Sequence, residues 1–237
     1  MYRYYLSFDD TDNLETPGTG HLLQGFLDSL PCESTFISRH QLFVHHDVPY
    51  TSHNSAMCAL VSENAELARL VSGASAYLES HAAPGADPGL CVADFQRLSC
   101  PERLVMWGYR AKKEILRKEE AYELAKECGV HLSEHGGDGQ GVVGALAAVG
   151  LRLSGNDGRV KGKKQAGEST LSVGALLKAT GFDRVCAYGI GQLPEDAVVK
   201  TGGNMIKAVY QNGCSTVLAV FDGGVYRLLT KDQLKCY

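Results

Sequence analysis

The chain has 237 residues, 44% of them hydrophobic and 21% charged, with a formal net charge of −4. This length allows one large or two modest domains, and the slight acidity means that any RNA contact needs a local basic patch. We see no run of residues long enough to cross a membrane and no secretory signal, so we expect a cytoplasmic protein. The eight cysteines form no C-x-x-C pair, which favours free thiols over disulfides and argues against a zinc ribbon.

The N-terminal stretch predicts a strand that ends in a cluster of carboxylates. The aromatic run from Tyr2 to Phe8 leads into Asp9, Asp10 and Asp12, which repel one another unless a cation lies among them. Their hard oxygen ligands suit Mg²⁺ better than Zn²⁺.

A helix follows the carboxylate cluster. Thr19, between Gly18 and Gly20, precedes an apolar face formed by Leu22, Leu23, Phe26, Leu27 and Leu30. The free backbone N–H groups and the dipole of a helix start favour an anion, so a metal and an anion side by side would suggest a phosphate site. The alternative is a strand end followed by an Asx-rich turn and a threonine N-cap.

Two further strands are expected at 35–37 and 41–44, followed by a polar segment at 45–55. Adjacent histidines on a strand point to opposite faces, so His45 and His46 would rarely share a zinc ion with His53. We favour a hydrogen-bonding loop that contacts substrate through Tyr50, His53 and Asn54, or that caps the sheet. Solvated loop histidines without a function are the alternative.

The middle of the chain alternates strand and helix. We expect a strand at 56–61, a helix at 63–81 with apolar residues at helical spacing, and a break at 82–89. A strand at 90–93, a weaker apolar run at 105–109 and a charged helix at 110–128 follow. This order suits a small α/β subdomain inserted into the first domain.

The second chemical signal is a glycine-rich loop, followed by a small, apolar helix that ends at Gly150. Backbone amides at a helix N-terminus favour an anion, and the glycines of this segment let phosphate approach closely. They are Gly136, Gly137, Gly139, Gly141 and Gly144. The loop is not a Walker motif, and 131–134 is a poor strand for a dinucleotide fingerprint. Tight packing of Gly141, Gly144 and Ala148 against a neighbouring element would explain the same residues.

The segment 154–170 is polar and predicts a mobile loop. It carries the most basic patch of the sequence, namely Arg159, Lys161, Lys163 and Lys164, which could hold phosphates or an RNA backbone. A solvated linker is the alternative. After it we expect a short helix at 173–180, a strand at 184–188 and a hairpin of 215–221 with 225–229.

Read together, these motifs resemble the archaeal tRNA-isoleucine agmatidine synthetase family. The match runs through Asp9-Asp10-Thr11-Asp12, a threonine at position 19, Val48-Pro49-Tyr50, Asp87-Pro88-Gly89 and Val143–Gly150. Ordered matches are more specific than any one motif. Gly18 stands where that family has a cysteine, and the residues from Leu171 onward have no counterpart, so we expect the OB-fold and zinc-ribbon domains of that family to be missing.

The resemblance implies an α/β (α+β) fold with a kinase-like catalytic domain made of 1–57 and 129–170. A ferredoxin-like subdomain would be inserted at 58–128, and 171–237 would form a β-rich C-terminal segment.

The resemblance also implies an ATP- and Mg²⁺-dependent ligase or phosphotransfer enzyme. Asp9, Asp10 and Asp12 would hold Mg²⁺, and Thr19 would lie near the γ-phosphate. The residues expected around ATP are Thr11, Gly18, Gly20, the five loop glycines, Lys161, Lys163 and Lys164. The acceptor is left open among tRNA, another RNA and a small molecule, and no membrane partner is expected. A non-catalytic nucleotide- or RNA-binding accessory protein is the alternative, and a haloacid-dehalogenase-type phosphatase lacks its later paired-Asp motif.

Overall fold

A computed structural model describes residues 1–48, 53–203, 205–230 and 232–236. The chain divides into two compact units, Met1–Ser154 and Gly155–Tyr237, which we call unit 1 and unit 2. No helix in the described part of the chain is both long and apolar enough to cross a membrane. The expected catalytic domain included residues 155–170, which belong to unit 2.

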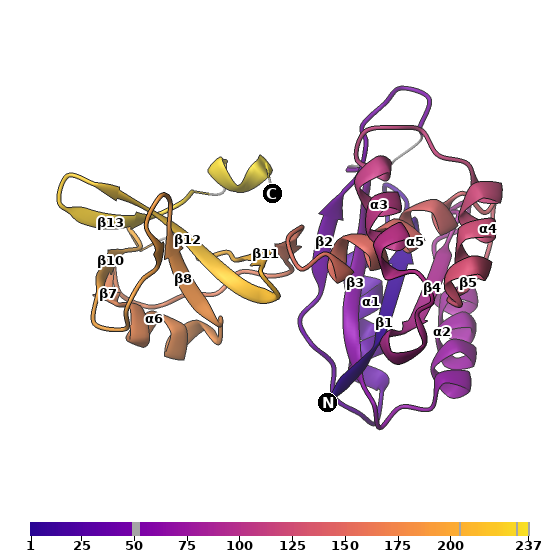
Figure 1. The fold of residues 1–237 in the computed structure, drawn as a ribbon, viewed down its shortest axis with the longest axis horizontal. Coiled ribbons are helices and arrows are strands. Elements are labelled where there is room, and N and C mark those ends of the chain that lie inside the picture. The colour runs from indigo at the N-terminus through magenta and orange to yellow at the C-terminus, as the bar shows by residue number, and fades with distance from the viewer. Residues whose placement is uncertain (49–52, 204, 231, 237) are drawn as a thin grey trace. The chain divides into compact units, whose positions relative to one another are not determined.

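Unit 1 contains an antiparallel sheet with the strand order β5-β4-β1-β3-β2 (Figure 1). Strand β1 lies at its centre because nearly every residue in it is buried, and it pairs with both β3 and β4. The strands are β1 (Tyr2–Asp9), β2 (Ser38–Gln41), β3 (Ser55–Ser62), β4 (Gly89–Asp94) and β5 (His131–Glu134). The expected poor strand at 131–134 is therefore a strand, since it completes the sheet edge beside β4.

Helices cover both faces of this sheet. Leu6 and Phe8 of β1 pack with α1 and α2, whereas Tyr5, on the opposite face, packs with α3, α4 and α5. This division follows from the alternation of side chains along a strand. The helices are α1 (Thr19–Ser29), α2 (Leu67–His81), α3 (Pro101–Ala111), α4 (Lys118–Cys128) and α5 (Gly141–Leu153), with a short 3₁₀ turn η1 (Phe95–Arg97) after β4.

The first part of unit 1 has the ferredoxin-like order β-α-β-β-α-β. Its strands lie in the order β4-β1-β3-β2, and each neighbouring pair is antiparallel, which is the split βαβ arrangement. It spans residues 2–94, whereas we expected a ferredoxin-like part at 58–128. Strand β1 is the reason, because it pairs on both sides with strands assigned to the insertion.

Two expected elements differ between residues 35 and 128. One strand, β2, replaces the candidates at 35–37 and 41–44. The charged helix expected at 110–128 is two helices, because α3 begins at Pro101 and ends at Ala111, and α4 begins at Lys118. Leu104, Trp107 and Ala111 are the buried face of α3, so the helical period began before the apolar run at 105–109.

Cysteine pairing also differs from expectation. Cys100, the N-cap of α3, forms a disulfide with Cys128, the last residue of α4. The two lie 28 residues apart in sequence, and the sequence gives no spacing signal for their proximity. Among the described residues, five cysteines are free thiols, of which Cys58 and Cys91 are buried.

Unit 2 is rich in β-structure, as expected for the C-terminal segment. Its strands follow the order β6-β11-β12-β13-β10-β7, and β8 joins β12 and β9. Residues 154–170 are not wholly a loop, because Val160 lies in β6 and Lys164 bridges to Ile206. The elements are β6 (Arg159–Val160), β7 (Thr170–Ser172), α6 (Val173–Thr180), β8 (Arg184–Ala187), β9 (Gly191–Gln192), β10 (Val198–Lys200), β11 (Val209–Gln211), β12 (Cys214–Asp222), β13 (Val225–Leu228) and η2 (Gln233–Cys236). The β12–β13 hairpin is confirmed.

Candidate functional site

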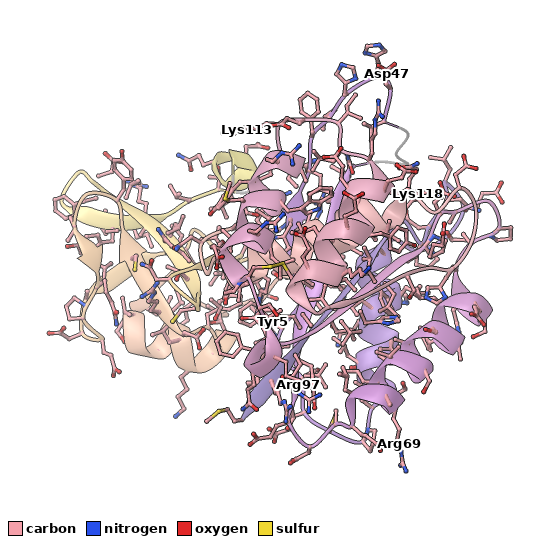
Figure 2. The ribbon with its side chains drawn as sticks, turned by 45° about the vertical axis from the view of Figure 1, so that its right-hand side comes forward. Tyr5, Asp47, Arg69, Arg97, Lys113 and Lys118 are labelled. Atoms are coloured by element: carbon pink, nitrogen blue, oxygen red, sulfur yellow. A yellow bond between two sulfur atoms is a disulfide. The ribbon has the colours of Figure 1, made fainter. Side chains whose placement is uncertain are left out.

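A cavity of about 570 Å³ lies in unit 1, where the end of β1 meets the start of α5. Asp9, Asp10 and Asp12 line it from one side, and Gly141 and Gly144 line it from the other. The two strongest sequence signals therefore share one cleft. Asp47 and Lys118 mark this end of unit 1, whereas Arg69 and Arg97 lie toward the opposite end (Figure 2).

The cavity wall is strongly acidic. A single arginine, Arg117, faces a group of eight carboxylates among the described lining residues. These are Asp9, Asp10, Asp12, Asp47, Asp87, Asp138, Glu114 and Glu119. A triphosphate would be repelled from such a wall unless cations accompanied it. Any anionic ligand here must therefore bring a metal ion or another positive charge.

Asp9 ends β1 and points toward α5. Its side chain is buried, and a Cβ atom on Gly144 would overlap its carboxylate. Burial, with the negative charges of Asp10 and Asp12, raises the pKa of Asp9 well above its usual value. Gly144 is thus required for close approach of α5 to this carboxyl group, which is the packing role that we left open.

Asp10 turns the chain out of the strand with a φ of +49°, in the left-handed region that Asp and Asn tolerate better than most residues. Burial, with the charges of Asp87 and Asp12, raises its pKa from the usual 3.8 to about 6. Without a bound cation, Asp10 is half-protonated near pH 6, and a cation would favour its ionised form.

Asp12 and Thr19 hold each other at the start of α1. The Asp12 Oδ1 atom accepts hydrogen bonds from the amide (3.0 Å) and the hydroxyl (2.9 Å) of Thr19. The Thr19 Oγ1 atom in turn accepts from the amide of Thr11 at 3.3 Å. This network caps the helix as the structural alternative foresaw, and it leaves the Thr19 hydroxyl on the cavity wall.

The glycine-rich loop folds around Asp87. The amide of Asp138 donates to Asp87 Oδ1 at 2.6 Å, and Lys118 Nζ donates to the carbonyl of Asp138 at 2.5 Å. Gly137 and Gly139 have φ values of +53° and +73°, which favour glycine. A Cβ atom on Gly141 would overlap the carbonyl oxygen of Asp87. These glycines therefore shape the turn and let the start of α5 touch the backbone before β4.

The other expected site residues have different locations. His53 and Asn54 line the cavity, and Asn54 Nδ2 donates to the carbonyl of Phe43 at 2.6 Å. Tyr50 lies outside the described residues. The described cavity lining includes none of Thr11, Gly18, Gly20, Gly136, Gly137 and Gly139.

The expected basic residues Lys161, Lys163 and Lys164 belong to unit 2. There Lys163 lines a separate cavity of about 370 Å³, whose walls include Met205, Ile206 and Lys207. Their expected contact with ATP stays a prediction.

Sequence reasoning missed several residues of the acidic wall. Asp87 could have been found from strand pairing, because Asp9 lies opposite Gly89 in the antiparallel β1–β4 pair, which brings the residue two positions earlier near the end of β1. Arg117 and Glu114 had no signal, since a continuous helix was expected where the chain makes the turn between α3 and α4.

The donor set fits Mg²⁺, which commonly binds through one or two carboxylates together with phosphate oxygens and water. Asp9 and Asp10 are adjacent, crowded by like charge and on the wall of one cavity. Within the described ranges, Asp9, Asp10 and Asp12 do not form a set of three ligand atoms within 4.8 Å of one another. Asp12 is engaged with Thr19, so Asp9 and Asp10 are the better candidates.

The raised pKa values predict a pH-dependent stability. Because the folded protein keeps a proton on Asp10 that the unfolded chain loses, this group's stabilising contribution is present below pH 3.8 and lost as pH rises through about 6. Solvent screening limits the loss to about 1–2 kcal/mol. In thermal melts in EDTA, Asp10→Asn should gain stability over the wild type between pH 4 and 7. A constant difference across that range would contradict the assignment.

No family model matches the sequence, and no curated protein matches it either. Solved structures do match. A complex of TiaS with tRNA and ATP is 24% identical with a TM-score of 0.55, and the match covers 63% of this chain and 36% of that one. The chain has the TiaS fold. A TiaS complex with tRNA, AMPCPP and agmatine matches at 24% identity and a TM-score of 0.54, with coverage of 63% and 36%.

A third match is a tRNA fluorescent labeling enzyme, at 25% identity and a TM-score of 0.55, covering 62% of this chain and 36% of that one. The mixed α/β class and the resemblance to TiaS are therefore confirmed. The chain matches about a third of the length of these TiaS structures, as expected for their N-terminal part.

Proposed function

We propose that this protein is an ATP-dependent enzyme whose unit 1 binds Mg²⁺ and ATP in the acidic cavity. One observation carries this proposal, namely that the carboxylates ending β1 and the glycines opening α5 line the same 570 Å³ cavity. Carboxylates to hold a cation and a helix N-terminus to face an anion are the two parts that phosphate chemistry needs side by side. The solved TiaS complexes with ATP and AMPCPP give this proposal further support.

Each group has a defined role in this proposal. Asp9 and Asp10 bind Mg²⁺, which would neutralise phosphate charge and orient the phosphate oxygens. The N-terminus of α5 directs its dipole toward the phosphates, and Arg117 adds a positive charge to the wall. Asp12 accepts a proton from Thr19, whose hydroxyl it already holds at 2.9 Å. Thr19 then either receives the γ-phosphoryl group or orients it.

We further propose that the substrate includes tRNA or another RNA, which unit 2 would contact. Unit 2 carries 11 Lys and Arg against 7 Asp and Glu, a formal charge of +4, whereas unit 1 carries 12 against 20, a charge of −8. Since phosphate backbones bind basic surfaces, the acidic net charge of the chain conceals a basic half. The tRNA complex of TiaS supports this partner.

A nucleotide-binding protein without catalysis is the second candidate. It is favoured by the Asp12–Thr19 network, which by itself explains both residues as a helix cap. Isothermal titration of the full chain with ATP, with and without Mg²⁺, followed by assay of ADP, AMP and pyrophosphate, separates the candidates. Binding that needs Mg²⁺ and yields one of these products supports the enzyme, and stimulation by added tRNA supports the RNA substrate. Binding without products supports the second candidate, and no binding rejects both.

Replacing Thr19 distinguishes a chemical role from a capping role. Thr19→Val removes the hydroxyl and both of its hydrogen bonds, which should cost about 1–2 kcal/mol of stability and abolish ATP turnover. Thr19→Ser keeps the hydroxyl and should retain both stability and turnover. Thermal melts and a product assay measure the two effects separately. Turnover by Thr19→Val at the wild-type rate would leave Thr19 with the capping role alone.

A further inference from the structure

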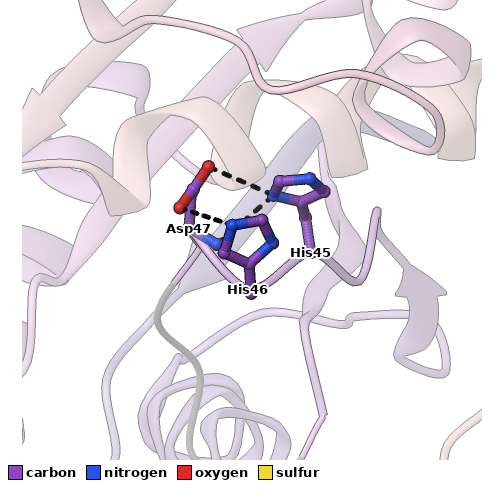
Figure 3. Close-up of side chains that lie close together, drawn as sticks. All are labelled: His45, His46 and Asp47. Carbon is purple, nitrogen blue, oxygen red and sulfur yellow. Dashed lines mark hydrogen bonds and ion pairs between the residues drawn. The ribbon is translucent and has the colours of Figure 1, made fainter.

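A second group of metal-ligating side chains lies at the edge of the acidic cavity. His45, His46 and Asp47 each present one ligand atom within 4.8 Å of the others (Figure 3). Asp47 also lines the cavity. Among the described residues, this is the one set of three or more His, Cys, Asp or Glu side chains that converges so closely.

A turn explains why neighbouring histidines point the same way. The amide of Val48 donates to the carbonyl of His45 at 3.1 Å, which closes a four-residue turn. We expected His45 and His46 on a strand, where they would point to opposite faces, but β2 ends at Gln41. The argument against a shared ion is therefore wrong for this pair.

The base of the loop is held on both sides. The amide of Phe43 donates to the carbonyl of Ala111 at 2.9 Å, and Asn54 donates to the carbonyl of Phe43 at 2.6 Å. The Phe43 ring stacks on the imidazole of His45, with centroids 5.4 Å apart and ring planes at 25°. These contacts orient His45 before any ligand binds, which lowers the entropy cost of binding.

The ligand atoms have the spacing that a tetrahedral ion requires. Bonds of about 2.0–2.2 Å to zinc place neighbouring ligand atoms about 3.3–3.5 Å apart. Asp47 Oδ1 lies 3.1 Å from His46 Nε2, and Asp47 Oδ2 lies 3.6 Å from His45 Nδ1. Both carboxylate oxygens thus face imidazole nitrogens.

The hydrogen bonding also favours a cation. The amide of Asp47 donates to His45 Nδ1 at 3.3 Å, so this nitrogen carries a lone pair and the ring proton lies on Nε2. A lone pair on Nδ1 then faces the negative Oδ2 atom of Asp47, and two acceptors facing each other gain most from a positive ion between them.

We infer that His45, His46 and Asp47 form a zinc site with three protein ligands and an open fourth position at the cavity edge. Two imidazoles and one carboxylate are a ligand set typical of catalytic zinc, whereas Mg²⁺ prefers oxygen ligands throughout. Because Asp47 lines the cavity, an oxygen or nitrogen atom of a molecule bound there can take the open position.

Zinc titration of the metal-stripped full chain, in competition with a chromophoric chelator and without nucleotide, tests the site independently of the proposed ATP chemistry. The wild type should bind one zinc ion, and His46→Ala and Asp47→Asn should each weaken binding about tenfold or more. His21→Ala is the matched control, since His21 is an exposed histidine elsewhere in unit 1, and should bind as the wild type does. Equal affinity in all four proteins, or no binding by the wild type, would overturn the inference.

Cobalt substitution separates this site from the free cysteines. Co²⁺ bound by His45, His46 and Asp47 should show visible d–d bands that are absent in His46→Ala, without a thiolate charge-transfer band. A thiolate band in the wild type would assign the metal to cysteine instead. Because the His46 side chain is 82% exposed, metal-free melting curves of variant and wild type should coincide, and Asp47→Asn provides a second test if they do not.

Discussion

Asp10→Asn is expected to lower ATP turnover by on the order of 10²-fold or more while leaving the metal-free fold intact or more stable. Asn keeps the size of the side chain and tolerates the φ of +49° at this position. It removes the negative charge that we propose binds Mg²⁺. Turnover at saturating ATP, measured across a range of Mg²⁺ concentrations, should show a raised Mg²⁺ requirement.

Asp28→Asn provides the control for loss of one carboxylate, because Asp28 is an exposed residue of α1 that does not line the cavity. It should turn over ATP at the wild-type rate. Wild-type turnover and Mg²⁺ dependence in Asp10→Asn would reject Asp10 as a metal ligand. Equal losses in both variants would show that the assay reports net charge rather than the site.

Gly141→Ala is expected to destabilise unit 1 by about 1–3 kcal/mol and to weaken ATP binding. The new Cβ atom would overlap the carbonyl oxygen of Asp87 and lie 2.8 Å from the amide nitrogen of Gly89. Both are backbone atoms, so α5 must move away from the strand. Denaturant unfolding and ATP titration measure the two effects.

Gly73→Ala is the matched control, because Gly73 lies inside α2 and its added Cβ would meet Phe26 at an ordinary 3.8 Å. Helix propensity alone should then stabilise the protein by about 0.5–1 kcal/mol. The two substitutions add the same atom to a helix, so opposite signs would isolate the close approach of α5. A stabilised Gly141→Ala would contradict the packing described here.

Local patterns predicted the parts of the site but not its full wall. The buried strand ending at Asp9 and the small-residue helix opening at Gly141 could be identified from the sequence, because each has a strong local signal. Asp87 and Asp47 reach the cavity only through tertiary structure, by the antiparallel β1–β4 pairing and by a turn after Phe43. Single-sequence patterns carry no register or loop conformation, so these carboxylates were missed.

The errors in the fold have similar causes. The charged stretch 110–128 has good helix formers throughout, so propensity could not locate the break before Lys118. The Cys100–Cys128 disulfide depends on the packing of α3 against α4, which no spacing reveals. The short strand β5 forms because the edge of β4 is available for pairing, and tertiary context overrides weak local preference.

A crystal structure of the full chain with a non-hydrolysable ATP analogue and Mg²⁺ tests the central claim most directly. We predict the metal bound to Asp9 and Asp10, with the phosphates between these residues and the N-terminus of α5. A nucleotide bound at another surface, with neither aspartate in contact with the metal, would contradict the account.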